Sequence, residues 1–458
     1  MILRHIYERS IAQSAYLVGC AQTGEAVVID PHVDIERYIE AARAEGLRIA
    51  AVAETHIHAD YVSGARALAE ATGATLYVSG EGGPEWQYTF AGEPHVRVLH
   101  DGDVFEIGRI RLQAVHTPGH TPEHLIYLVT DGAAGDHPLG AFTGDLLFVG
   151  DIGRPDLLER AAGLKGTMEA GARTLFASLR RLDALPDHLV IWPGHGSGSA
   201  CGKSLGGVPV SSLGYERLTN WGLRERDEAA FVEAVLSGQP EPPMYFGEMK
   251  RVNKYGEPAW TGAAFPELDD RHVGAALDAG ELVVDVRTTT GSEPTLPGAL
   301  VVPFGANFAT WAGSVVPAAT KLLLLADDAA RAREAARVLA IVGRRDVAGW
   351  IAPATFHAWQ RSGGRVDEPA VVDTIEPGDL PLDVRSGTEW DAGHIENARH
   401  APLARLSEYA ADLDRDASIV VYCQSGARAT VAASALRRMG FRRVATLRGG
   451  YEAFERAA

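Results

Sequence analysis

The stretch that decides the fold of the N-terminal half reads Glu54-Thr-His56-Ile-His58-Ala-Asp60-Tyr61. It follows a predicted buried strand over residues 47–52, at the point where the strand gives way to a loop. Three side chains that can bind a metal lie within five residues, a density that a purely structural role explains poorly. The stretch therefore predicts a metal site just after the end of a strand.

Three further residues that can bind a metal each directly follow a glycine. A glycine lets the backbone turn sharply and aim the next side chain into a shared site. A single histidine in such a place would more often cap a helix or lie in the core, but four such elements in this order disfavour that interpretation. The three later elements are Thr117-Pro-Gly-His120, Thr143-Gly-Asp145 and Pro193-Gly-His195.

Short β-branched runs alternate with helical patterns through the first 200 residues. Residues 26–30 and 47–52 are predicted as buried strands, and residues 35–45 as an amphipathic helix between them. Later strand-like runs cover residues 110–115, 124–129 and 188–192. This alternation predicts a layered α/β domain.

The pattern of histidines and aspartates resembles the metallo-β-lactamase superfamily over roughly the first 240 residues. The resemblance implies an αββα sandwich with the metal at one edge of two sheets. In the two-metal hydrolases of that superfamily, one metal takes three histidines, which correspond to His56, His58 and His120. The second metal needs a histidine directly after the first aspartate, where this chain has Tyr61. A two-zinc hydrolase is therefore disfavoured.

A better match is the persulfide dioxygenase branch, whose members hold a single non-haem iron. The resemblance implies that His56, His120 and Asp145 bind one Fe(II) per chain and leave room for O₂ and a substrate sulfur. It implies that a second set of residues surrounds these ligands, fixing tautomers and exchanging protons. That set is His58, Asp60, Tyr61 and His195.

The stretch from Thr143 to Asp156 is also similar to that branch. There Arg154 is predicted to bind the anionic tail of a thiol carrier, or else to lie in a surface turn.

Beyond residue 262 the chain repeats itself at an offset of 97 to 99 residues. The run Leu282-Val-Val-Asp-Val-Arg287 matches Pro381-Leu-Asp-Val-Arg385, and residues 321–325 match residues 418–422. Residues 321–325 and residues 418–422 are each followed by six residues that end in arginine and then by an alanine-rich helix. Two copies of one small α/β domain are therefore predicted in tandem.

The second copy contains Cys423-Gln-Ser-Gly-Ala-Arg428 ahead of its helix. A thiol in a loop of backbone N–H groups at a helix N-terminus is held as the thiolate. This loop resembles that of the rhodanese family, which implies sulfur transfer with Cys423 and Arg428 as catalytic residues. In the first copy the aligned loop, residues 326–331, has alanine in place of cysteine and two aspartates that would repel an anion. That copy is predicted to be inactive and to serve as a scaffold or docking module.

Cys201 lies six residues after His195 in a glycine-rich segment, residues 196–204. If His195 lines the metal pocket, this thiol is close enough to reach it and to hold a transient persulfide; a structural role is the alternative. Fusions of a persulfide dioxygenase to tandem rhodanese domains carry a similar segment. Cys20 lies in a predicted strand and is expected in the core.

Composition limits the partners that the chain can have. The chain has 458 residues with a formal net charge of -17, which disfavours nucleic acid or an anionic membrane. No apolar run is long enough to span a bilayer, and the N-terminus does not look like a secretory signal, so a cytoplasmic location is expected. The three scattered cysteines are expected to be free thiols.

The expected layout is an α/β multidomain chain. A dioxygenase domain covers residues 1–245 and a linker residues 246–262. An inactive rhodanese-like domain at 263–365 and an active rhodanese domain at 366–458 follow.

The expected activity is oxidation of a low-molecular-weight thiol persulfide by O₂ to sulfite, followed by sulfur transfer to sulfite that gives thiosulfate. This combination suits sulfide detoxification. Two alternatives stay open: a zinc-dependent thioester hydrolase of the glyoxalase II type, and a sulfane-sulfur carrier with a vestigial metal site. A homo-oligomer is expected because related enzymes commonly form one.

Overall fold

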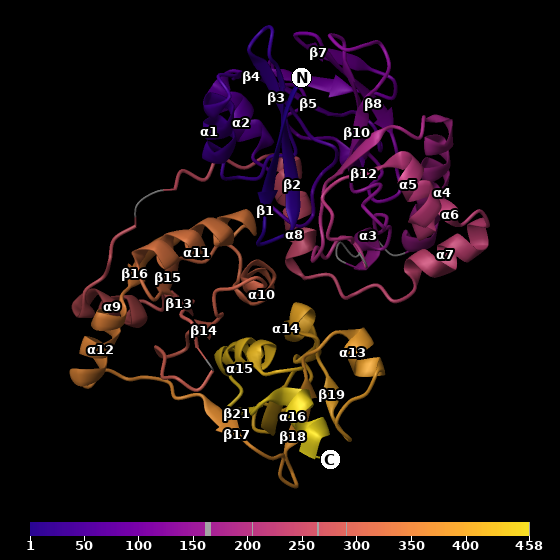
Figure 1. The fold of residues 1–458 in the computed structure, drawn as a ribbon. Helices are drawn as coiled ribbons and strands as arrows, with labels where there is room; N and C mark the ends of the chain where they lie inside the picture. The colour runs from indigo at the N-terminus through magenta and orange to yellow at the C-terminus, as the bar shows by residue number, and fades with distance from the viewer. Residues whose placement is uncertain (161–165, 204, 263–264, 290, 458) are drawn as a thin grey trace. The chain divides into compact units, whose positions relative to one another are not determined.

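The computed structural model describes residues 1–160, 166–203, 205–262, 265–289 and 291–457. Contacts divide the chain into two units, Met1–Gln239 with Tyr245–Thr261, and Pro240–Met244 with Gly262–Ala458 (Figure 1). Ser204, the last residue of the predicted glycine-rich segment, and residues 263–264, at a predicted domain boundary, lie outside the described residues.

In the described part of the N-terminal unit, two six-stranded sheets pack face to face. The core between them takes Val18 and Val27 from one sheet and Leu112 and Tyr127 from the other, all fully or almost fully buried. The predicted sandwich is confirmed. The first sheet runs β1 (Ile2–Glu8), β2 (Gln13–Cys20), β3 (Glu25–Ile29), β4 (Arg48–Ala53), β5 (Thr75–Ser79), β6 (Val96–Leu99), and the second runs β12 (Ser211–Ser212), β11 (Val190–Pro193), β10 (Gly140–Gly144), β9 (Leu125–Asp131), β8 (Ile110–His116), β7 (Val104–Ile107).

Helices cover the outer face of each sheet. Tyr38 and Leu68 pack on the outer face of the first sheet, and Leu175 and Phe231 on that of the second. Each sheet is therefore buried on both faces, which explains the nearly continuous apolar strands. The helices are α1 (Glu36–Ala44) and α2 (Ala65–Thr72) on the first sheet, and α4 (Met168–Arg181), α5 (Leu213–Thr219), α6 (Trp221–Arg224) and α7 (Glu228–Leu236) on the second, with the short α3 (Leu157–Arg160) before α4.

The predicted metal-binding residues all follow the carboxyl ends of strands. His120, Asp145 and His195 come after β8, β10 and β11, three strands that run in the same direction and so end at one edge of the second sheet. His56 comes after β4 of the first sheet. Strand direction alone therefore brings the loops of the second sheet together.

The linker expected at residues 246–262 differs from the structure. Helix α8 (Tyr245–Tyr255) occupies much of it and belongs to the N-terminal unit. Its Phe246, Met249 and Val252 are buried at helical spacing. The prolines just before α8 hid this amphipathic pattern in the sequence.

The second unit contains the two predicted repeats as parallel sheets with equivalent strand orders. In the first repeat an isolated parallel bridge between Glu267 and Trp350 stands where the second repeat has a strand pair, β17 with β21. The first repeat has β14 (Leu300–Val301), β13 (Leu282–Asp285), β15 (Leu322–Leu325), β16 (Val347–Ile351) and helices α9 (Asp270–Asp278), α10 (Phe308–Val315), α11 (Ala329–Ile341), α12 (Pro353–Arg361); the second has β17 (Ala370–Val372), β21 (Arg443–Leu447), β20 (Ser418–Tyr422), β18 (Leu380–Asp383), β19 (Arg399–His400) and helices α13 (Gly387–Asp391), α14 (Leu406–Tyr409), α15 (Ala427–Arg438), α16 (Gly450–Ala457).

Helix α15 packs between the two repeats. Its residues 429–436 are all buried, whereas a helix at a protein surface would show a polar face. The Val301 N–H of the first repeat donates to Ser434 Oγ at 3.0 Å. Gly291 lies so close to α15 that a Cβ there would fall 2.2 Å from Thr430 Oγ1. The first repeat therefore covers the helix that begins at the cysteine loop.

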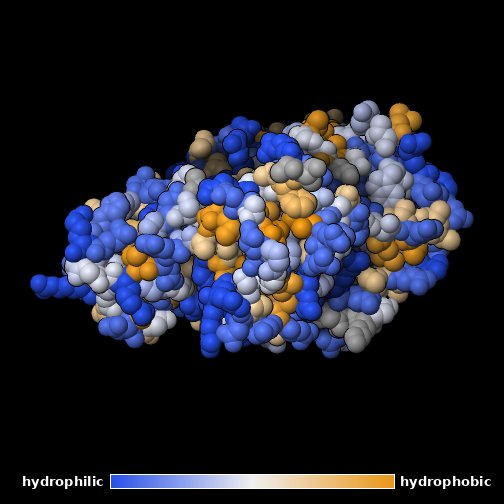
Figure 2. Space-filling model, turned by 90° about the horizontal axis from the view of Figure 1, so that it is seen from below, coloured by the Kyte–Doolittle hydropathy of each residue, from blue (hydrophilic) through white to orange (hydrophobic). Residues whose placement is uncertain are grey.

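Within the described residues, no helix is both long and apolar enough to cross a membrane. Hydrophilic residues dominate the face shown in Figure 2, with hydrophobic residues interspersed among them.

Candidate functional site

His56, His120 and Asp145 meet at one point of the N-terminal unit. Their ligand atoms all lie within 4.8 Å of one another, and the three side chains are 1–2% exposed. Asp145 Oδ2 lies 4.0 Å from His56 Nε2 and 3.5 Å from His120 Nε2. The two imidazole rings stand at 89° to each other, with centroids 4.9 Å apart. Three donors thus face one shared point.

Hydrogen bonds fix the tautomers of both histidines. His120 Nδ1 donates to the Arg154 carbonyl oxygen at 3.0 Å, because a carbonyl can only accept. His56 Nδ1 donates to Thr55 Oγ1 at 2.9 Å, since that hydroxyl gives its own proton to Asp30. Both Nε2 atoms therefore keep a free lone pair for a metal.

The Asp145 carboxylate supports a cation at the same point. Neither of its buried oxygens has a hydrogen-bond partner among the described residues. Although burial opposes its charge, His195 and His120 hold the pKa of Asp145 below its usual range. Burial and neighbouring imidazoles lower the pKa values of His56 and His120, so both are neutral near pH 7. Two imidazoles and one carboxylate fit a divalent first-row metal.

His124, which sequence reasoning did not assign to the site, orients Asp145. Its Nε2 accepts the Asp145 N–H at 3.0 Å while its Nδ1 lies 3.0 Å from Thr117 Oγ1. Burial lowers the pKa of His124 to about 3, which keeps the ring neutral. The only signal in the sequence was its position four residues after His120, inside a predicted strand.

His58 lies beside the three ligands but outside the group that they form. Its Nε2 is 3.2 Å from Asp30 Oδ1, and its ring stacks on Tyr61 at 4.5 Å. Although burial opposes the charge, Asp30 raises the pKa of His58 to about 9. His58 Nδ1 is buried with no hydrogen-bond partner among the described residues. Asp30, in a left-handed conformation with φ 53°, is a second residue that sequence reasoning did not assign to the site.

The hydroxyl of Tyr61 is bound to Gln13 and to the backbone of Asp30. The hydroxyl donates to the Asp30 carbonyl oxygen at 3.3 Å. Burial raises the pKa of Tyr61 well above its usual value. A neutral phenol facing a carbonyl does not replace the missing histidine as a ligand.

Asn253 of α8 holds the loop that carries His58 and Tyr61. Its Nδ2 donates to the carbonyl oxygens of these two residues at 2.8 and 2.7 Å, and its Oδ1 accepts the Ser63 N–H at 2.8 Å. This contact joins residues about 190 positions apart, so no local pattern in the sequence could reveal it.

Asp60, His195 and Cys201 form a second buried group whose ligand atoms lie within 4.8 Å. His195 Nε2 is 3.3 Å from Asp60 Oδ2 and 3.5 Å from Asp145 Oδ1, so the two groups adjoin. Cys201 is 2% exposed, and burial together with Asp60 and Asp145 raises the pKa of its thiol well above the usual value.

Arg154 is fully buried. Its guanidinium donates to the two Asp156 carboxylate oxygens at 3.0 and 2.7 Å and to the Ala200 carbonyl oxygen at 3.0 Å. The structure thus places Arg154 against the Cys201 loop and matches its charge with Asp156; it does not lie in a surface turn.

Cys423 lies at the carboxyl end of β20, ahead of α15. The Gly426 N–H donates to its Sγ at 3.2 Å, and no side chain among the described residues caps this helix. The Cys423 carbonyl oxygen accepts the Tyr451 N–H at 2.8 Å. A Cβ on Gly450 would lie 2.3 Å from that carbonyl oxygen, which explains the glycine at the first position of α16.

Arg428 closes the loop through a bidentate ion pair with Glu389, at 2.6 and 2.7 Å. Glu389 also accepts the Ser386 N–H at 2.9 Å. Although partial burial opposes the charge, hydrogen bonds from Arg428 and Ser386 lower the pKa of Glu389 to about 2. Sequence reasoning missed Glu389, which follows the Asp-Val-Arg motif by four residues.

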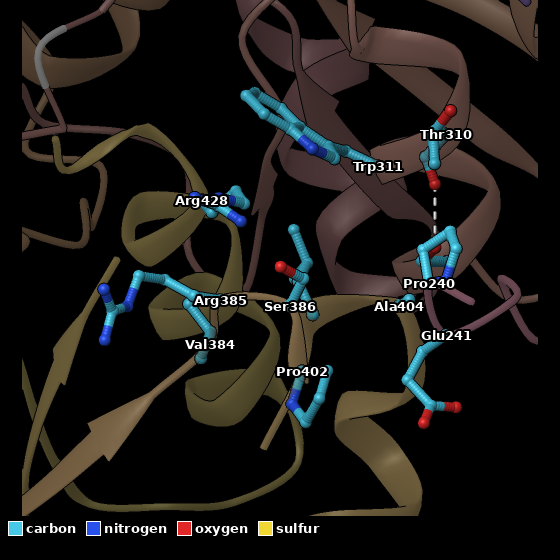
Figure 3. Close-up of a pocket in the computed structure, with 12 residues that line it drawn as sticks. Pro240, Glu241, Thr310, Trp311, Val384, Arg385, Ser386, Pro402, Ala404 and Arg428 are labelled. Atoms are coloured by element: carbon cyan, nitrogen blue, oxygen red, sulfur yellow. Dashed lines mark hydrogen bonds between the residues drawn. The ribbon is translucent and has the colours of Figure 1, made fainter. Parts of the chain in front are cut away.

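A cavity of about 130 Å³ adjoins Arg428 in the second unit. Thr310 and Trp311 of the first repeat line it opposite Arg428 and Ser386 of the second (Figure 3). The first repeat thus contributes to the surroundings of the cysteine loop.

The first repeat has a different loop. Ala326 is fully buried after β15, and Asp328 caps α11 by accepting the Arg331 N–H at 2.8 Å. Asp327 Oδ2 accepts the Thr288 N–H at 3.2 Å. Carboxylates therefore take the place that a bound anion would need.

Comparison with known proteins identifies both parts of the chain. Residues 11–195 match the metallo-beta-lactamase superfamily, and residues 370–457 match the rhodanese-like domain. The chain is 29% identical over 223 residues to the mitochondrial persulfide dioxygenase of Bos taurus, covering 48% of this chain and 75% of that protein. It is 32% identical over 246 residues to the hydroxyacylglutathione hydrolase of Rhodospirillum rubrum, covering 52% and 80%.

Among solved structures, a metallo-beta-lactamase from Staphylococcus aureus subsp. aureus COL superposes with a TM-score of 0.68 at 38% identity. The superposition covers 77% of this chain and 99% of that chain. This share is larger than the N-terminal unit alone, so the likeness continues into the second unit.

Proposed function

The chain belongs to the metallo-β-lactamase superfamily and carries a rhodanese-like domain, and from this premise we propose that it is a persulfide dioxygenase joined to a sulfurtransferase. The observation that carries the proposal is the buried group of His56, His120 and Asp145, with the Tyr61 hydroxyl bound to the Asp30 carbonyl oxygen. In this proposal the group holds one Fe(II) per chain.

At the metal centre the overall change is RSSH + O₂ + H₂O → RSH + SO₃²⁻ + 2 H⁺. Bound iron supplies the electron-transfer chemistry that lets O₂ react with the persulfide sulfur. Asp60 and His195 line the place next to it and exclude water, since both are at most 5% exposed. His195 Nδ1 faces the Ala12 carbonyl oxygen at 3.2 Å, so its Nε2 takes or returns a proton beside Asp60 and Asp145.

At the second site the Cys423 thiolate takes the terminal sulfur of another persulfide: Cys–S⁻ + RSSH → Cys–S–S⁻ + RSH. Sulfite then removes that sulfur: Cys–S–S⁻ + SO₃²⁻ → Cys–S⁻ + S₂O₃²⁻. The loop N–H groups and the end of α15 stabilise the sulfur anion at Cys423. Arg428, held by Glu389, keeps the loop in shape.

A zinc-dependent thioester hydrolase is the second candidate, favoured by the identity to the hydroxyacylglutathione hydrolase. It needs a second metal, for which Asp60, His195 and Cys201 would be the ligands. The two functions therefore differ in the number and kind of metal ions per chain. A vestigial metal site in a sulfur carrier is disfavoured, because the ligand donors are all present and preoriented.

The test is metal analysis of the purified chain, with an oxygen-electrode assay on glutathione persulfide and a thioester hydrolysis assay. One iron per chain and O₂ uptake are expected. His120→Ala or Asp145→Ala should abolish O₂ uptake and leave sulfur transfer at Cys423 intact, whereas the control His188→Ala should change neither. Two zinc ions per chain with thioester hydrolysis and no O₂ uptake would contradict the proposal.

Homo-oligomer formation and a cytoplasmic location stay predictions, to be checked by light scattering and by fractionation of cells.

A further inference from the structure

We propose that Asp151 and Arg154 are positioning residues that fix Cys201 beside Asp60 and His195. The inference rests on the proposed function, in which this thiol takes a sulfur atom from the persulfide next to the metal centre. It also gives Arg154 a role other than binding the tail of a thiol carrier.

The loop that carries Cys201 is rich in glycine and, over its described residues, has few hydrogen bonds within itself. Residues 196–203 read Gly-Ser-Gly-Ser-Ala-Cys-Gly-Lys, and Gly198 has a φ of 99°. Glycine loses more conformational freedom on folding than any other residue, so a loop of this kind stays ordered only if other groups hold it. Cys201 is nevertheless 2% exposed.

Two hydrogen bonds hold the loop from both sides of the cysteine. Arg154 donates to the carbonyl oxygen of Ala200, the residue before it, at 3.0 Å. Asp151 Oδ2 accepts the N–H of Lys203, two residues after it, at 2.7 Å. Both clamping side chains come from one short segment, residues 151–154, which follows the ligand Asp145.

The clamping side chains are themselves fixed. Arg154 is fully buried and paired with Asp156, while Asp151 is 1% exposed and accepts the Trp221 Nε1–H at 2.9 Å. Burying charged groups costs free energy unless they are fully paired. We infer that Asp151 and Arg154 are buried here because they fix the place of the Cys201 thiol.

That place is next to the metal centre. The ligand atoms of Cys201, Asp60 and His195 lie within 4.8 Å, and His195 Nε2 is 3.5 Å from Asp145 Oδ1. Asp60 Oδ2 is buried and has no hydrogen-bond partner among the described residues. The thiol therefore lies beside a buried carboxylate oxygen that has the His195 ring as a neighbour, at 3.3 Å.

The step assigned to Cys201 is Cys–SH + R–S–S⁻ → Cys–S–S⁻ + RSH. The S–S bond of the carrier breaks, and a bond forms between Cys201 Sγ and the terminal sulfur. The thiol proton goes to the sulfur of the leaving carrier. No oxidant is needed.

The test is the rate at which N-ethylmaleimide labels Cys201 in the full chain, resolved by mass spectrometry with Cys423 as the internal reference. Asp151→Ala should raise this rate about tenfold, since labelling of a buried thiol follows local opening and the charge-assisted hydrogen bond from the Lys203 N–H to Asp151 is lost together with the one from Trp221. Asp151→Asn, which keeps an acceptor, should give an intermediate rate. Arg154→Lys should also raise it.

Lys203→Ala is the matched control. It removes the side-chain bonds of Lys203 to the Ala234 and Ser237 carbonyl oxygens but keeps the backbone N–H that Asp151 binds. Its labelling rate at Cys201 should equal that of the wild type. Bound metal and the labelling of Cys423 should stay unchanged in all four variants, which reports on folding.

A second readout is sulfur on Cys201 after incubation with glutathione persulfide. The wild type should acquire it and Asp151→Ala should lose most of it. Unchanged labelling in both Asp151→Ala and Arg154→Lys, or no sulfur on wild-type Cys201, would overturn the proposal. Labelling of Cys201 requires neither metal nor turnover. A chain without dioxygenase activity would therefore contradict the proposed function, while the labelling rates would still test the positioning roles of Asp151 and Arg154.

Discussion

The two repeats of the second unit have equivalent sheets, but the loop before α11 differs from the loop before α15. In the first, the Asp328 carboxylate caps α11 and Ala326 is buried behind it. In the second, α15 begins at Gly426 with no side-chain cap among the described residues, and the Gly426 N–H points at Cys423 Sγ. A helix N-terminus attracts one anion, and the first repeat supplies that anion itself.

In the proposed function, sulfur transfer at Cys423 needs a helix end that no carboxylate of the chain occupies. The Asp-X-Arg pair survives in both repeats, as Asp285 with Arg287 and Asp383 with Arg385, each at 2.7 Å. This pair therefore belongs to the fold. In the second repeat, Arg428 forms a bidentate pair with Glu389. In the first repeat, the aligned Arg331 lies over the ring of Phe304.

Replacing the thiol should have the largest effect. Cys423→Ser is expected to abolish sulfur transfer while O₂ uptake stays nearly unchanged, because the metal ligands lie in another unit. The product should change from thiosulfate to sulfite, measured by chromatography of the derivatised anions. Thiosulfate at the wild-type rate without sulfite would mean that the second step takes place at the metal or in solution.

Adding a thiol to the first repeat should restore almost none of the sulfur transfer that Cys423→Ser removes. In a Cys423→Ser background, Ala326→Cys is expected to restore less than about a hundredth of sulfur transfer, since Asp327 and Asp328 disfavour a thiolate there. The measurement is transfer from thiosulfate to cyanide. Adding Asp328→Gly should increase the rate at which a thiol reagent labels the new cysteine. Sulfur transfer restored by Ala326→Cys alone would show that Asp327 and Asp328 do not prevent the reaction.

Removing the charge that pairs with Arg428 should have an intermediate effect. Glu389→Gln is expected to lower kcat/KM of sulfur transfer about tenfold, through the loss of a charge-assisted bidentate pair that is partly exposed. The pKa of Glu389 lies at about 2 instead of 4.5, so the pair stabilises the fold above pH 4.5 and is lost as the pH falls towards 2. The stability difference between variant and wild type should therefore shrink below pH 4.5 in urea titrations.

Removing the cap of the first repeat should have the smallest effect. Asp328→Ala is expected to cost about 1 kcal/mol of stability, as measured by urea denaturation of the full chain. Sulfur transfer should be unchanged, because this carboxylate lies in the other loop. A large loss of transfer would mean that the first loop takes part in the reaction.

From periodicity and short motifs at strand ends, the sequence predicted a layered α/β domain, the tandem repeats and a shared metal site. The αββα sandwich and the selection of His56, His120 and Asp145 as ligands came from the resemblance to a known family. The linker over residues 246–262 was predicted less well. Proline and glycine suggested a break, while the buried face of α8 became visible only through what it packs against.

Only the tertiary structure decided the contacts between residues that are distant in the sequence. Three such contacts join segments 39 residues or more apart: Asn253 with the loop of His58, Glu389 with Arg428, and Arg154 with the Cys201 loop. The sequence by itself determined which residues could bind a metal or carry sulfur, because that depends on residue type and local spacing. The three-dimensional packing decided which of them are neutral, oriented and held in place, because tautomer, burial and charge pairing depend on neighbours that no local pattern specifies.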